Sequence, residues 1–240
     1  MTVQAGDRAF NNIAAIVFDK DGTLADSLPF LLHLTHSRVQ QVEARCPGIQ
    51  AELLKAFGLV GDRLDPAGLM AVGTRPDNEV AAAAYVAAQG HPWGDALTWV
   101  KQAFAAADQA TPRKALKTPP LDGTFTLCQR LAQAGLKLAL VSGDTTDHVQ
   151  DFIDCYDLNP WFQLGLGSDG TWAKPDSALL RQTCEKLGVT AAQTLVIGDA
   201  QLDQQLATRS AGFISVTWGG SGAISGADAV LENPGQLTVS

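Results

Sequence analysis

Four short and nearly continuous apolar runs constrain the fold of this chain more than any other feature. They cover residues 13–18, 136–141, 194–197 and 213–216. Runs of this length without polar alternation are typical of parallel strands that are covered on both faces. Helix-like segments at 122–134, 176–187 and 201–210 alternate with the last three runs, and each has a glycine near its end. This alternation predicts an α/β fold with a doubly wound parallel sheet.

A long stretch between the first two runs has a different character. Residues 27–118 are rich in Ala, Leu and Gln, and their apolar residues recur at helical spacing. We therefore expect a separate α-helical subdomain there, inserted into a core formed by residues 1–26 and 119–240. The Thr118-Pro119-Pro120 segment is the expected return linker, because proline stiffens a connection and excludes a helix.

Composition excludes several classes of function. The 240 residues carry a net charge of -8 and no block of Lys or Arg, so binding to nucleic acid through phosphate neutralisation is not expected. No run reaches the roughly 20 apolar residues that span a bilayer, and the polar start lacks a signal core. Four scattered cysteines favour a reducing compartment. We expect a cytoplasmic protein without a membrane partner; its oligomeric state stays open.

The first apolar run ends in a group of acidic residues. Asp19 and Asp21 follow it directly, and Gly22 permits a sharp turn after them. Ligands bind at the carboxyl ends of strands in open parallel sheets. Two carboxylates at alternate positions of a strand point to the same face, where they repel each other unless a cation or proton lies between them. Mg²⁺ favours such oxygen ligands.

Two later runs end in complementary groups. Asp199 and Asp203 follow the run at 194–197 and are one helical turn apart if a helix begins there. Ser142 follows the run at 136–141, and a hydroxyl beside backbone N–H groups at a helix start suits a phosphate. Lys174, which precedes a proline, could supply a cation to the same pocket.

These motifs in this order resemble those of the haloacid dehalogenase-like hydrolases. The resemblance rests on Asp-x-Asp-Gly-Thr, a serine at a strand end, Lys-Pro and Gly-Asp-x-x-x-Asp, and it covers most of the chain. The stretch FDKDGTLADS is specific by itself, and VTWGGSG near the end resembles the phosphoglycolate phosphatase-like members. The resemblance implies a Rossmann-like core with a helical cap that encloses the site.

The resemblance also implies roles for the residues that match. Asp19 would be the nucleophile that forms an aspartyl-phosphate, and Asp21 the general acid that protonates the leaving alcohol and then the base for water. Lys174 would neutralise the phosphoryl oxygens, while Ser142 and the Gly143 N–H orient them. Members that cleave carbon–halogen bonds lack the second acid, so its presence favours phosphate chemistry.

The same resemblance implies a Mg²⁺ site. Its ligands would be the Asp19 carboxylate, the backbone carbonyl of Asp21 and the Asp199 carboxylate. Asp203 would be a water-mediated ligand or a partner of Lys174.

Some residues carry weaker expectations. Gly22 and Thr23 are expected near the phosphate, with Thr23 stabilising the loop. Arg75 in the helical insertion suits an anionic substrate tail, although an exposed arginine at a helix start is the alternative reading. The chain departs from the family pattern at Lys20, where an apolar residue is usual, and at Gly143, where many relatives have a polar one. Strand alternation points Lys20 away from Asp19, so we expect no catalytic role for it.

The sequence thus predicts a Mg²⁺-dependent phosphatase for a small phosphorylated metabolite, with phosphoglycolate as the first substrate candidate. A phosphomutase of the same superfamily would use the same two aspartates and transfer the phosphoryl group to a sugar. A non-catalytic phospho-aspartate signalling module also has strand-end aspartates, a hydroxyl and a lysine, but the long insertion and the second aspartate argue against it. A degenerate enzyme that only binds ligands has no support, because every acidic position is present.

Overall fold

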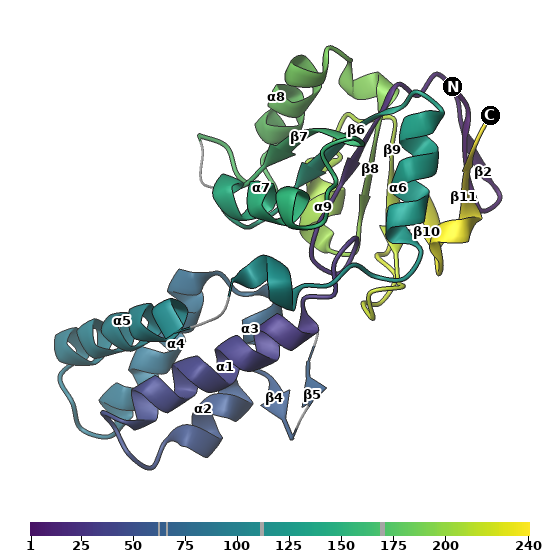
Figure 1. The fold of residues 1–240 in the computed structure, drawn as a ribbon. Coiled ribbons are helices and arrows are strands. Elements are labelled where there is room, and N and C mark those ends of the chain that lie inside the picture. The colour runs from purple at the N-terminus through teal and green to yellow at the C-terminus, as the bar shows by residue number, and fades with distance from the viewer. Residues whose placement is uncertain (62, 66, 111–112, 169–170) are drawn as a thin grey trace. The chain divides into compact units, whose positions relative to one another are not determined.

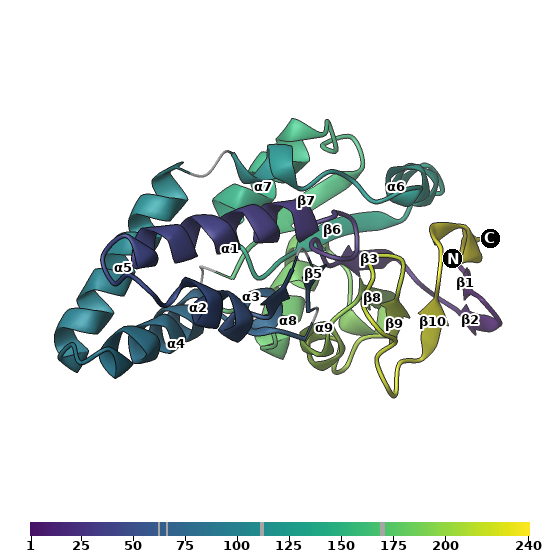
Figure 2. The ribbon, with the colours of Figure 1, turned by 90° about the horizontal axis from the view of Figure 1, so that it is seen from below.

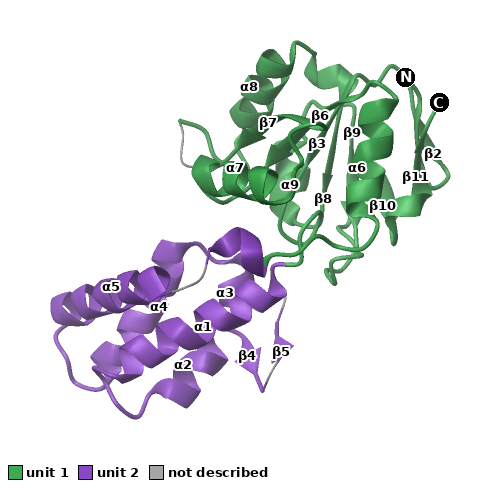
Figure 3. Ribbon diagram, in the orientation of Figure 1, with its two compact units in different colours: residues 1–26, 118–240 green, residues 27–117 purple. Residues whose placement is uncertain are grey.

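The chain forms two compact units in the computed structural model, which describes all residues except 62, 66, 111–112 and 169–170. One unit consists of residues 1–26 and 118–240 and the other of residues 27–117 (Figure 3). We call them the core unit and the insertion unit. The division falls within one residue of each boundary expected from the sequence.

A parallel sheet forms the centre of the core unit, as the apolar runs predict. Among the described residues it has six strands, all paired in parallel. In spatial order these are β10 (Ala229–Leu231), β9 (Gly212–Val216), β8 (Thr194–Gly198), β3 (Ala15–Phe18), β6 (Lys137–Val141) and β7 (Phe162–Leu166). The predicted α/β fold class is confirmed. The two edge strands, β7 and β10, were not predicted, because Gln163 and Gly165 interrupt the apolar pattern of β7 and β10 has only three residues.

The strand order places the carboxyl ends of three strands together. β3 is central, with Val17 beside Ala139 of β6 and beside Val196 of β8. The chain passes from β3 outward through β6 to β7 and then returns to β8 on the other side of β3. Such a reversal of strand order leaves a crevice outside the carboxyl ends of the strands, which is where open α/β sheets bind ligands.

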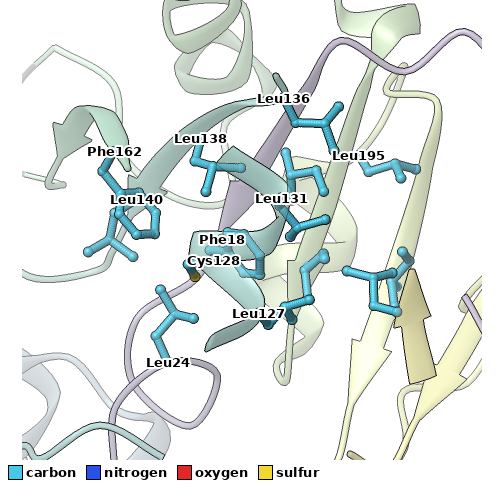
Figure 4. Packing of buried hydrophobic residues seen from close by; sticks show 14 of the residues in the cluster. Phe18, Leu24, Leu127, Cys128, Leu131, Leu136, Leu138, Leu140, Phe162 and Leu195 are labelled. Atoms are coloured by element: carbon cyan, nitrogen blue, oxygen red, sulfur yellow. The ribbon is translucent and has the colours of Figure 1, made fainter. Parts of the chain in front are cut away.

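Helices cover both faces of this sheet (Figure 2). One face is covered by α6 (Thr124–Gln133) and α7 (Thr146–Cys155), and the other by α8 (Ser177–Leu187) and α9 (Gln201–Leu206). Alternate residues of β3 serve the two layers: Phe18 packs with the α6 side, and Val17 with the α8 side. Figure 4 shows how the α6 residues meet Phe18 and the β6 leucines. Burial on both faces explains the continuous apolar runs.

The two ends of the chain meet in a small antiparallel sheet. β1 (Val3–Ala5) pairs with β2 (Arg8–Phe10) on one side and with β11 (Leu237–Val239) on the other. The N- and C-termini therefore lie close together (Figure 1). Strands of three residues carry too little periodicity to be predicted from a sequence.

The insertion unit is mainly helical. Its α-helices are α1 (Leu28–Glu43), α2 (Gln50–Ala56), α3 (Leu69–Val72), α4 (Arg75–Ala88) and α5 (Trp93–Ala110). They enclose a separate core in which the rings of Phe57 and Phe104 meet edge to face. A short antiparallel pair, β4 (Leu59–Val60) and β5 (Arg63–Leu64), departs from the all-helical expectation. In the part of the chain that is described, no helix is long and apolar enough to cross a membrane.

Candidate active site

The loop after β3 brings its first aspartate to the crevice. Asp19 continues the sheet, because its N–H donates to the Ile197 carbonyl of β8 at 2.8 Å. The chain then turns sharply at Gly22, which has a φ of +79°. A Cβ atom there would lie 2.2 Å from Asp199 Oδ2. Only glycine satisfies both the backbone conformation and this close approach.

Three carboxylates converge at the carboxyl ends of β3 and β8. Asp19, Asp199 and Asp203 each offer an oxygen, and these oxygens lie within 4.8 Å of one another. We call these three residues the acid cluster. Asp203 lies in α9, where its Oδ2 accepts the Ala200 N–H at 3.1 Å and its side chain is buried. The one-turn spacing of Asp199 and Asp203 therefore brings both carboxylates close to Asp19.

Lys174 supplies a cation to the acid cluster. Its Nζ donates to Asp19 Oδ1 at 2.5 Å and to Asp203 Oδ1 at 2.6 Å. Burial lowers the pKa of Lys174, but the two carboxylates outweigh burial, so the pKa lies above its ordinary value and the group stays charged. Asp203 is thus in contact with Lys174, as one of the two roles expected for it requires; its role as a water-mediated ligand stays a prediction.

The electrostatics of the acid cluster favour a further cation. Burial is the largest effect on Asp19 and raises its pKa, and Asp203 and Asp199 raise it further against the opposing ammonium of Lys174. Burial also raises the pKa of Asp199. When all three carboxylates are ionised, they and the ammonium group of Lys174 carry two net negative charges, and a cation would offset the repulsion that raises these pKa values. A hard divalent cation with oxygen ligands fits this donor set.

Asp199 is oriented by Thr23, which the sequence placed in the site, and by Ser221, which sequence reasoning missed. Its Oδ2 accepts the Ser221 hydroxyl at 2.6 Å, and its Oδ1 accepts the Thr23 hydroxyl at 3.3 Å. Trp218 Nε1 donates to the Thr23 carbonyl at 2.7 Å, so the segment after β9 clamps the turn after β3. The VTWGGSG stretch contained the only sequence signal for this clamp, and it gave no role to either residue.

The strand end after β6 carries the predicted hydroxyl. Ser142 is buried, its Oγ accepts the Asp144 N–H at 3.1 Å, and its carbonyl accepts the Ser168 hydroxyl at 2.9 Å. Ser168 Oγ in turn accepts the Lys174 N–H at 3.4 Å. Gly143 is exposed, and a Cβ atom at this position would meet nothing within 4 Å. Ser168, which was not predicted, thus connects the serine and lysine loops.

Asp21 lies outside the acid cluster and has a cation of its own. Its Oδ1 accepts from Lys20 Nζ at 2.6 Å, and the same Nζ lies 2.9 Å from Asp144 Oδ2. Lys20 is directed away from Asp19, as strand alternation predicts, and its ammonium group forms two ion pairs. Its side chain is only 1% exposed and bridges two carboxylates.

Arg75 lies in the insertion unit at the first turn of α4. Its guanidinium pairs with Glu79 at 2.9 Å and with Asp108. Asp108 also accepts from Arg38, whose guanidinium lies 4.7 Å from the centre of the Phe104 ring. Two carboxylates already hold Arg75, an arrangement that favours a structural role within the insertion unit.

Comparison with known proteins identifies the class to which this fold and site belong. Residues 13–208 match the model of the haloacid dehalogenase-like hydrolases, and the chain therefore belongs to that family. The family prediction is confirmed, and membership of this family makes the protein an enzyme of the hydrolase class.

Several proteins to which this chain is similar carry the name phosphoglycolate phosphatase. A phosphoglycolate phosphatase from Thiobacillus denitrificans is 28% identical over 202 residues, which cover 83% of this chain and 80% of that protein. The phosphoglycolate phosphatase of Escherichia coli K12 is 26% identical over 242 residues, covering 86% and 81%. A crystal structure from Haemophilus somnus, described as a predicted phosphoglycolate phosphatase, superposes with a TM-score of 0.70 at 21% identity and covers 93% of this chain and 96% of that one.

The fold by itself does not separate hydrolases from mutases. A Thermotoga maritima structure, described as a candidate beta-phosphoglucomutase, has a TM-score of 0.60 at 16% identity and covers 92% of this chain and 95% of that one. At these identities the structural likeness shows the shared architecture alone. The reaction must therefore be argued from the site residues.

Proposed function

We propose that this protein is a Mg²⁺-dependent phosphatase that hydrolyses a small phosphomonoester through an aspartyl-phosphate on Asp19. The observation that carries this proposal is the convergence of Lys174 on Asp19 and Asp203 beside Asp199 at the carboxyl ends of the strands. A carboxylate nucleophile needs nearby positive charge to approach a phosphate dianion, and this arrangement provides it.

In the first step, an Asp19 carboxylate oxygen attacks phosphorus. The new bond joins that oxygen to phosphorus, and the bond from phosphorus to the alcohol oxygen breaks. Asp21, in its protonated form, gives its proton to the leaving oxygen, so that a neutral alcohol departs. Lys174 keeps its charge throughout and stabilises the negative charge of the phosphoryl oxygens.

In the second step, water attacks the phosphorus of the aspartyl-phosphate. Asp21, now ionised, takes a proton from that water. The bond between Asp19 and phosphorus breaks, inorganic phosphate leaves, and both carboxyl groups return to their starting forms.

A Mg²⁺ ion would be held by the carboxylates of Asp19 and Asp199 and by the backbone carbonyl of Asp21. When bound, the ion supplies neutralisation of phosphoryl charge. Thr23 and Ser221 orient Asp199 for this purpose through the hydrogen bonds described above.

The phosphate is held mainly by the ends of β3 and β6. Ser142 contributes its hydroxyl, Gly143 its backbone N–H, and Gly22 with Thr23 the turn beside the acid cluster. Arg75 remains a candidate for an anionic substrate tail only if it exchanges one of its carboxylate partners for the substrate.

Phosphoglycolate is the first substrate candidate, because relatives at 25–28% identity carry the name phosphoglycolate phosphatase. The test is phosphate release from phosphoglycolate, sugar phosphates, nucleoside monophosphates and p-nitrophenyl phosphate with Mg²⁺. Asp19→Asn and an EDTA-treated sample run beside the wild type. We expect release by the wild type alone, restored after EDTA by added Mg²⁺.

Two outcomes contradict the proposal in different ways. Full release by Asp19→Asn removes the covalent mechanism, and indifference to EDTA removes the metal. A mutase gives a third pattern, in which the phosphoenzyme persists until a sugar bisphosphate is formed. Trapping of the phosphorylated protein by mass spectrometry, with and without a sugar phosphate acceptor, distinguishes that reaction from hydrolysis.

A further inference from the structure

Among the described residues, Lys20 is the most deeply buried charged residue that has no role in the proposed mechanism. Its side chain is 1% exposed, whereas its partners Asp21 and Asp144 retain 30% and 16% exposure. Its Nζ lies 5.6 Å from the centre of the Phe152 ring in α7, which gives the cation a fixed aromatic neighbour. The ammonium group is therefore buried in the protein, whereas the two carboxylates that it contacts are partly exposed to solvent.

Stability alone does not account for a lysine at this position. Removing an ammonium group from water costs free energy that its ion pairs recover only in part, and an apolar side chain of similar size is often as stabilising. Burial accordingly lowers the pKa of Lys20, and Asp21 and Asp144 outweigh that effect, so the pKa lies above its ordinary value. The lysine remains a cation in contact with both carboxylates.

The two contacts connect different parts of the site. Asp21 follows β3 and is the proposed acid–base residue, while Asp144 follows β6 and its N–H donates to Ser142 Oγ at 3.1 Å. One ammonium group thus connects the residue that transfers protons to the strand end that holds the phosphate. A general acid must lie within hydrogen-bond reach of the leaving oxygen, and an error of about 1 Å in its position costs about a hundredfold in rate.

We propose that Lys20 is a positioning residue that fixes the Asp21 carboxyl group relative to the phosphate-binding end of β6. This inference rests on the proposed function, because it requires Asp21 to transfer the proton. It assigns a task to a residue for which the sequence predicted none.

The test uses the leaving group as its readout. The parameter kcat/KM reports the steps up to formation of the phosphoenzyme, in which an alkyl alcohol needs a proton and p-nitrophenolate does not. We compare phosphoglycolate, or the best alkyl ester of the panel, with p-nitrophenyl phosphate. The proteins are the wild type, Lys20→Met, Lys20→Arg and Asp21→Asn, with Lys186→Met as an exposed lysine control in the same unit.

Lys20→Met should lower kcat/KM for the alkyl ester roughly ten- to a hundredfold, a part of what general acid catalysis contributes. The value for p-nitrophenyl phosphate should change by less than about threefold, since its leaving group needs no proton. Lys20→Arg, which keeps a cation between the carboxylates, should recover part of the loss. Lys186→Met should match the wild type.

An equal loss for both substrates, or no loss for either, overturns the positioning role. If Lys20→Met does not fold, as judged by circular dichroism, Asp144→Asn replaces it. That variant removes one contact of the lysine and should show a smaller loss of the same selectivity; equal losses for both substrates again overturn the inference.

Asp21→Asn separates failure of this inference from failure of the proposed function. A selective loss for the alkyl ester in Asp21→Asn but not in Lys20→Met removes only the role of Lys20. Absence of selectivity in Asp21→Asn removes the proposed acid, and the role of Lys20 with it.

Discussion

The contact between Gly22 and Asp199 offers a sharp test of how closely the site is packed. Gly22 has a φ of +79°, and a Cβ atom added to it would lie 2.2 Å from Asp199 Oδ2 and 2.7 Å from Asp199 Cγ. Gly22→Ala therefore imposes two costs. The backbone enters a region that disfavours L side chains, and the Asp199 carboxylate must move by about 1 Å to restore ordinary contact distances.

The size of the effect follows from the local contacts. The left-handed backbone conformation costs roughly 1–2 kcal/mol for a residue with a Cβ atom. Moving Asp199 also weakens its hydrogen bonds from Ser221 and Thr23, which stabilise by roughly 1 kcal/mol each. We expect Gly22→Ala to lower the free energy of unfolding by about 2–4 kcal/mol. Because we propose Asp199 as a Mg²⁺ ligand, its displacement should also raise the half-saturating Mg²⁺ concentration about tenfold or more.

Urea unfolding followed by circular dichroism measures the first effect, and phosphate release at varied Mg²⁺ the second. The matched control is Gly188→Ala at the end of α8, where φ is +65° but the nearest atom to a Cβ lies 3.7 Å away. The control should lose about 1 kcal/mol and keep the wild-type Mg²⁺ response. If Gly22→Ala behaves like Gly188→Ala in both assays, Asp199 does not lie against this turn and the reasoning fails.

Four further predictions follow from the charges of the two units. Lys174→Met leaves buried carboxylates unpaired, so the free energy of unfolding in EDTA should fall by about 3–5 kcal/mol, and Mg²⁺ should restore part of it. Equal stability of this variant in EDTA and in Mg²⁺ contradicts the prediction. Ser221→Ala frees one Asp199 oxygen and should weaken Mg²⁺ roughly tenfold with little change in kcat at saturating metal. Because burial raises the pKa of Asp199, protons compete with the metal at higher pH than for an ordinary carboxylate, so Mg²⁺ affinity in titration calorimetry should begin to fall on acidification before an ordinary aspartate would be protonated. Asp108→Asn should destabilise the insertion unit in urea by about 3 kcal/mol, because it leaves the buried Arg38 without its carboxylate.

The sequence predicted the elements of the fold that repeat a strong local pattern. The four apolar runs became β3, β6, β8 and β9, because nearly all of their residues are buried, and burial on both faces favours apolar side chains. The edge strand β7 reads FQLGL, and only its two ends are buried. The pair β4 and β5 has two residues in each strand. Neither segment has enough apolar residues to be distinguished from a loop.

The acidic residues of the site were predictable for a related reason. Asp19 and Asp199 each directly follow a buried strand, and adjacent parallel strands bring their carboxyl ends together. This argument needs only the order of apolar runs and the residues that end them. Trp218 and Ser221 lie in the loop after β9, whose path no local pattern determines, and their contacts depend on how that loop folds back over Thr23 and Asp199.

The sequence reasoning on Lys20 considered one strand at a time and therefore gave no counterion for its ammonium group. Alternation along β3 correctly turns the Lys20 side chain away from Asp19. The sequence of β3 alone, however, does not show which residues lie on the side to which Lys20 turns. The neighbouring strand supplies what was missing: Phe18 pairs with Leu140 in parallel register, and continuing that register by two residues places Lys20 beside Ser142. Asp144 lies two positions further on and points to the same edge, which explains how it reaches the ammonium group at 2.9 Å. A charged residue just beyond a strand end should therefore be judged against the neighbouring strand ends, since the register, rather than the sequence distance, selects its counterion.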